Sequence, residues 1–83
     1  MTEREAWQPN VPREGLMFID KESGQVFEMI FIRERHHRHG SLIDLKLHGP
    51  EFEMHVCEEV QFYENVLHER WRVLTSKEAA AVE

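Results

Sequence analysis

Three turn signals divide the middle of this chain into four short apolar segments, and this division most constrains how the chain can fold. The turns lie at Lys21-Glu22-Ser23-Gly24, in a polar stretch that ends at Gly40, and at Gly49-Pro50. The segments between them are five to nine residues long and rich in residue types that favour strands. Four strands in sequence order, joined by tight connections, predict an antiparallel β-meander.

The alternation of apolar residues predicts which face of this meander is buried. With Gly49-Pro50 as a two-residue turn, Leu47 lies opposite Phe52, and the same face carries Phe31, Leu45 and Met54 as core residues. The opposite face then holds Glu28, Lys46 and Glu53 in one row across three strands. The sequence therefore predicts a sheet with one apolar face that needs a cover.

Residues 58–75 supply that cover if they form one amphipathic helix. Val60, Tyr63, Leu67, Trp71 and Leu74 share one half of the helical wheel, and acidic residues occupy the first turn. We therefore expect an α+β fold, a four-stranded antiparallel meander with one C-terminal helix packed on one face. The alternative ends the helix near Val66 and uses residues 68–74 as a fifth strand that closes a small SH3-like β-barrel.

Length and composition indicate one domain. A chain of 83 residues has room for one core, so we expect an arm at residues 1–14, a domain at 15–75 and a tail at 76–83. No apolar run exceeds four residues, so neither a signal peptide nor a membrane helix is predicted. The single cysteine, Cys57, excludes an internal disulfide and favours a reducing compartment, which predicts a cytoplasmic location.

The most unusual stretch is a cluster of basic residues at the predicted tip of the second hairpin. We call it the Arg/His tip, and it comprises Arg33, Arg35, His36, His37, Arg38 and His39. Such a cluster is either a solvated loop or a contact for an anion or a partner, because guanidinium groups bind phosphate and carboxylate. Two histidines alone do not make a tight metal site, so no metal or cofactor is expected.

Two further surfaces are candidates for partner contacts. Residues 51–69 carry six acidic residues and no Lys or Arg, within a net charge of −6. The acidic surface is predicted at Glu58, Glu59, Glu64 and Glu69. The reverse face of the sheet also carries more apolar residues than a solvated face needs, which predicts cover by the arm or by a second copy of the chain. The candidate dimer face comprises Met17, Ile19, Ile30, Ile32 and Leu42.

The sequence contains no catalytic triad, phosphate-binding loop or HExxH motif, so it predicts a protein that is not an enzyme. The favoured hypothesis is a small acidic protein-binding module, a regulator, inhibitor or adaptor of the kind found in phages and mobile elements. It would occupy the surface of a protein partner and form a homodimer. The alternative is a single-stranded nucleic-acid-binding protein that uses the Arg/His tip.

Overall fold

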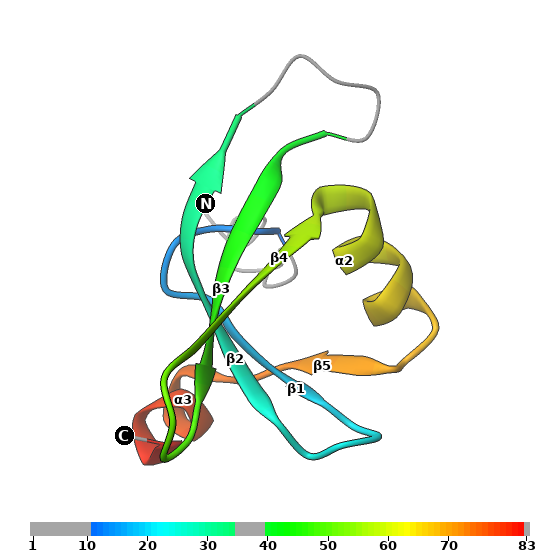
Figure 1. The fold of residues 1–83 in the computed structure, drawn as a ribbon. Coiled ribbons are helices and arrows are strands. Elements are labelled where there is room, and N and C mark those ends of the chain that lie inside the picture. The colour runs from blue at the N-terminus through cyan, green and yellow to red at the C-terminus, as the bar shows by residue number, and fades with distance from the viewer. Residues whose placement is uncertain (1–10, 35–39, 83) are drawn as a thin grey trace, which may run out of the picture.

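Five antiparallel strands form one sheet in the order β4-β3-β2-β1-β5 (Figure 1). The structure is a computed structural model that describes residues 11–34 and 40–82. The elements are β1 (Met17–Asp20), β2 (Val26–Arg33), β3 (Leu42–His48), β4 (Glu53–Glu58), α2 (Glu59–Leu67), β5 (Trp71–Val73) and α3 (Ser76–Val82). The predicted α+β class, with a meander followed by a helix, is confirmed.

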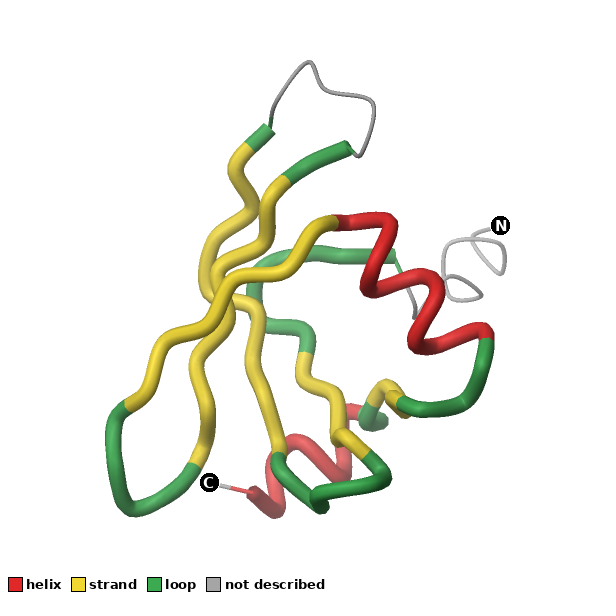
Figure 2. The backbone as a smooth tube through the Cα atoms, turned by 45° about the vertical axis from the view of Figure 1, so that its right-hand side comes forward, coloured by secondary structure: helices red, strands yellow, loops and turns green. Residues whose placement is uncertain are grey.

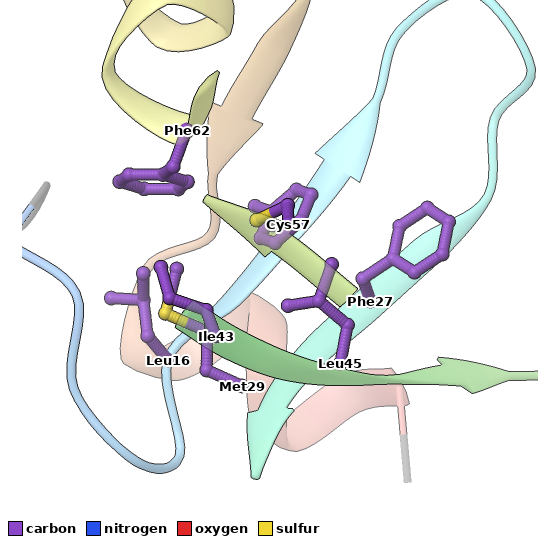
Figure 3. Packing of buried hydrophobic residues seen from close by; sticks show 8 residues of the cluster. Leu16, Phe27, Met29, Ile43, Leu45, Cys57 and Phe62 are labelled. Carbon is purple, nitrogen blue, oxygen red and sulfur yellow. The ribbon is translucent and has the colours of Figure 1, made fainter. Parts of the chain in front are cut away.

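The core lies between the sheet and α2. Its buried members come from β1 to β4, from the residue before β1 and from α2 (Figure 3): Leu16, Phe18, Phe27, Met29, Ile43, Leu45, Cys57 and Phe62. The ring of Phe18 stacks on Phe27 and Trp71, with centroids 5.5 and 4.5 Å away, and meets Phe62 edge-on at 5.7 Å. One aromatic side chain therefore joins β1, β2, β5 and α2.

The first hairpin and the start of the second have the predicted register. Phe18 pairs with Phe27, Phe27 with Leu47, and Met29 with Leu45. The first turn is closed by the Asp20 carboxylate, whose Oδ1 accepts a hydrogen bond from the Glu22 backbone N–H at 2.9 Å. Gly24 follows with a φ of +79°, which a residue with a Cβ rarely adopts.

A β-bulge in β2 overturns the prediction for the end of that strand. The register shifts between Met29 and Phe31, so that Phe31 pairs with Asp44 and Ile32 with Ile43. Because an inserted residue moves every later side chain to the other face, Phe31 is exposed and Ile32 packs against the core. The prediction of Phe31 as a core residue was wrong.

The connection between β3 and β4 overturns the prediction for β4. A two-residue turn at Gly49-Pro50 would need a positive φ at Gly49, and Gly49 does not have one. The connection instead spans residues 49–52, and Lys46 pairs with Met54 rather than with Glu53. This shift of one residue places Met54 on the outer face, where it is exposed, so its assignment to the core was wrong.

The predicted single helix over residues 58–75 is also wrong, because α2 ends at Leu67. The last turn closes in a Schellman motif, in which the Arg70 N–H donates to Asn65 O at 2.8 Å and the Glu69 N–H donates to Val66 O at 3.0 Å. Glu69 takes the left-handed position of this motif, with φ +61°. No Gly or Asn stands there to mark the helix end in the sequence.

The chain then returns as the fifth strand that the barrel alternative requires. β5 pairs with β1, with Phe18 opposite Val73 and Asp20 opposite Trp71. Within the described residues β4 and β5 do not pair with each other, and α2 contacts both of these edge strands (Figure 2). Of the residues predicted to pack on the sheet from α2, Val60, Tyr63 and Leu67 are exposed, because only the narrow line of Phe62 and Val66 faces the core.

The predicted tail forms α3, which is tied to β5. Thr75 and Glu78 make a capping box: the Glu78 carboxylate accepts from the Thr75 N–H at 2.9 Å, and Thr75 Oγ1 accepts from the Glu78 N–H at 3.1 Å. The Arg72 guanidinium also donates to Glu78 Oε1 at 3.0 Å. This hydrogen bond from Arg72 is the largest cause that lowers the pKa of Glu78 to about 2.

The register predicts unequal effects for two truncations in neighbouring strands. Leu45→Ala removes a buried side chain and should lower the free energy of unfolding by about 2–5 kcal/mol. Met54→Ala removes an exposed side chain and should lower it by less than about 1 kcal/mol. Urea unfolding followed by tryptophan fluorescence measures both, and equal losses would contradict the observed register.

The helix end makes a second prediction. Glu69→Gly relieves a left-handed residue and should raise the free energy of unfolding by up to about 1 kcal/mol, after the flexibility that glycine adds is subtracted. The ion pair lost with Lys21 is exposed and long, at 3.9 Å, so its loss matters little. Glu64→Gly, inside the same helix, is the matched control and should lower stability by about 1 kcal/mol. A loss of stability from both changes would contradict the Schellman assignment.

Candidate functional site

Four apolar side chains, from β2, from β4 and from the residue before β4, stay exposed. We define the outer patch as four residues whose exposed fractions are 50% for Phe31, 73% for Phe52, 44% for Met54 and 55% for Val56. Phe31 and Val56 lie in one cross-strand row on either side of Asp44. An exposed cluster of apolar side chains such as this one is a candidate contact surface for a partner.

The main chain of β4 has one edge that no strand of the described residues pairs with. Glu59 N–H donates to Ser41 O at 2.9 Å, which fixes which facing residues of β3 and β4 exchange hydrogen bonds. Because this pattern alternates along an antiparallel ladder, His55 and Cys57 point their N–H and C=O groups at β3. Met54 and Val56 point theirs away from β3. Among the described residues no strand pairs with this outer edge of β4.

A groove of about 250 Å³ lies on the inner side of β4, between this strand, α2 and β5. Its lining combines a buried apolar part from the core with a polar rim from β4 and α2: Phe27, Leu45, His55, Val56, Cys57, Gln61, Asn65 and Trp71. Figure 3 labels Phe27, Leu45 and Cys57 among the packed core residues, and all three line the groove. The groove therefore presents an apolar surface next to the outer edge of β4.

Polar contacts hold the rim of this groove in place. The His55 ring meets Phe27 edge-on at 5.3 Å, and its Nε2 lies 2.9 Å from Glu53 Oε1. Gln61 Oε1 accepts from the Glu58 N–H at 2.8 Å, which caps the start of α2. Asn65 Oδ1 accepts from Arg70 Nε at 2.7 Å. These contacts fix the orientation of the rim side chains.

The predicted acidic surface does not form a single face. Glu58 caps the first turn of α2, and Glu69 lies beyond its last turn, with its carboxylate 3.9 Å from Lys21. Glu59 Oε1 accepts from the Ser41 N–H at 3.0 Å and is therefore engaged within the fold. Glu64 is exposed on the helix between them. The four acidic side chains therefore have different surroundings, and none of them lines the groove.

Only Arg33 of the Arg/His tip lies within the described residues. Its Nη2 donates to Asp44 Oδ1 at 2.7 Å, an ion pair between β2 and β3 on the outer face. The other tip residues, Arg35, His36, His37, Arg38 and His39, lie outside the described residues. Within residues 11–34 and 40–82, no group of three or more His, Cys, Asp and Glu is placed to hold a metal ion.

The candidate dimer face is divided by the fold. Met17 is buried within the monomer, and the bulge turns Ile32 towards the core. Ile30 stays exposed, while Ile19 and Leu42 are half-buried. The exposed apolar surface of this face therefore lies nearer to β4 than the sequence indicates.

Sequence reasoning missed the outer patch because it paired β4 one residue out of register. The signal was present in the alternation of β4, where Glu51, Glu53 and His55 occupy one face and Phe52, Met54 and Val56 the other. Hydrophobicity alone assigns the second set to the core. Only the conformation at Gly49 reverses that assignment.

No protein-family model, curated protein or solved structure matches this chain. Of the helices in the described part of the chain, none is both long enough and apolar enough to cross a membrane.

Cys57 is buried in the folded chain, so the reactivity of its thiol reports on folding. Burial is the main cause that raises the pKa of its thiol from 9.0 to about 11, with the Glu58 carboxylate as the second cause. At pH 8 the folded chain should hold about a hundredfold less thiolate than the unfolded chain, so iodoacetamide should alkylate it correspondingly more slowly. Mass spectrometry with and without 8 M urea measures the two rates, and similar rates would contradict the buried position of Cys57.

Proposed function

We propose that this protein is a non-enzymatic protein-binding module whose contact surface is the outer patch together with the unpaired edge of β4. The observation that carries the proposal is the coincidence of two features in one strand. Met54 and Val56 expose apolar side chains, and within residues 11–34 and 40–82 no strand pairs with the main-chain groups that they point away from β3. An exposed apolar edge strand invites association, and proteins normally protect such an edge.

The scale of the chain supports a role as a regulator, inhibitor or adaptor. It is small and acidic, with a net charge of −6, so charge complementarity would steer it to a basic surface of a larger partner. The lone cysteine is consistent with a reducing compartment such as the cytoplasm. Nucleic-acid binding through the Arg/His tip has less support, because the Arg33 guanidinium is already paired with Asp44.

A pair of charge-matched variants tests this function. Val56→Lys places a charge in the outer patch and should weaken binding to the natural partner at least about tenfold, which corresponds to 1.4 kcal/mol. Lysine is tolerated there structurally, since Asp44 lies opposite on β3. The control is Leu67→Lys, which makes the same change at a residue that is 75% exposed on α2.

The measurement uses affinity capture from the native host to identify a stoichiometric partner, followed by titration of that partner against each variant. We expect Leu67→Lys to bind as the unaltered chain does. Thermal melting confirms that both variants are folded. Equal binding by the unaltered chain and Val56→Lys would overturn the outer patch as the contact surface.

A further inference from the structure

We infer that β4 accepts, as an added antiparallel strand, an extended segment of a partner protein that carries an apolar anchor followed by alternating apolar and basic residues. This inference rests on the proposed function and names the partner's chemistry. Pairing at a sheet edge uses main-chain hydrogen bonds for affinity and alternate side chains for specificity. β4 presents both requirements in one stretch, and each part of the segment follows from the residues it would meet.

The main-chain contacts come from Met54 and Val56. Their N–H and C=O groups point away from β3. The hydrogen bond from the Glu59 N–H to Ser41 O sets the alternation of the ladder, in which His55 and Cys57 bond to β3. The other edge strand, β5, is only three residues long, against six in β4. An added strand therefore has more main chain to pair with at β4.

The outer side chains of the added strand meet apolar neighbours. Residues opposite Met54 and Val56 project onto the same outer face, next to Phe52 and in line with Phe31. Valine or isoleucine suits these positions, because β-branched side chains pack well on a pleated surface. The next residues of the added strand alternate to the inner side of β4.

Side chains of the added strand on the inner side of β4 would lie beside the groove near His55 and beside carboxylates near Glu53 and Glu51. The residue opposite His55 lies beside the groove, whose buried lining of Phe27, Leu45 and Cys57 favours an apolar anchor such as leucine. The residues opposite Glu53 and Glu51 lie next to carboxylates, in a stretch with no Lys or Arg between residues 51 and 69. Charge complementarity therefore calls for lysine or arginine at these two positions.

Polarity along the strand follows from the same arrangement. Arg70 is the cation beside the groove, where it donates to Asn65, so basic residues of the partner are favoured at the Glu51 end instead. In antiparallel pairing the partner runs opposite to β4, so its apolar anchor precedes its basic residues. The segment therefore reads apolar, anchor, apolar, basic, apolar, basic.

A synthetic peptide of this design tests the inference directly. The probe is acetyl-Val-Leu-Val-Lys-Val-Lys-amide, added to the full chain and followed by amide hydrogen exchange in NMR spectra. At ten times the Kd of the peptide, exchange at the Met54 and Val56 amides should slow about tenfold. A peptide with Glu for both Lys residues should bind at least about tenfold more weakly.

Two controls separate strand addition from other modes of binding. N-methylation of the first and third peptide residues removes the donors that would face β4, and it should abolish binding. Glu53→Gln should weaken binding of the lysine peptide severalfold, while Glu64→Gln, the same change on α2, should leave it unaltered. Equal affinity for the methylated peptide, or unchanged exchange at Met54 and Val56 under saturating peptide, would overturn the inference.

Self-association is the competing outcome. If the Met54 and Val56 amides become protected without peptide as the protein concentration rises, a second copy occupies the edge and the inference of a basic partner segment fails. This result is distinguishable from failure of the proposed function. Loss of partner binding in Val56→Lys supports the outer patch whatever the peptide does, and retention of partner binding rejects the patch.

Discussion

The packing around the ring of Phe18 is the contact on which the rest of this structure depends. This ring contacts Phe27 of β2, Phe62 of α2 and Trp71 of β5. One residue of β1 therefore packs against three other elements. A chain of this size buries a smaller share of its surface than a larger domain does. The relative positions of these elements therefore depend on one aromatic cluster, whereas in a larger core they would depend on many residues.

Two small backbone features decide which side chains this core leaves outside. The bulge after Met29 turns Phe31 outward, and the four-residue connection at residues 49–52 turns Met54 outward. Each feature shifts the register by one residue and thereby turns an apolar side chain from the inner face of the sheet to the outer face. Together they assemble the outer patch on the side of the sheet opposite the core.

The position of α2 explains why the exposed strand is β4. The helix contacts both edge strands and leaves a groove beside β4 instead of a closed seam. On the outer side of β4 lies the apolar patch, and on its inner side lie the groove and the carboxylates of Glu51 and Glu53. The proposed partner segment follows from this asymmetry, because each face of an added strand would meet a different chemistry.

The sequence by itself determined the α+β class, the order of the first four strands and the register of β1, the first part of β2 and the last part of β3. Alternating apolar residues and the turn at residues 21–24 are local signals, and they suffice where a strand has one clear buried face. The sequence also predicted the start of α2, because Glu58 and Glu59 precede the apolar residues of an amphipathic helix. The spacing of the apolar residues after Leu67 favoured a continued helix, although a strand was the alternative.

Only the tertiary structure decided the helix end, the fifth strand and the face of β4. The helix ends in a Schellman motif with a glutamate in the left-handed position, and Trp71 is then drawn into a strand by its stacking on Phe18. The face of β4 depends on the φ angle at Gly49, which the residue type permits but does not fix. The candidate site could not be read from the sequence for this reason, since its exposed residues are the ones that hydrophobicity assigns to a core.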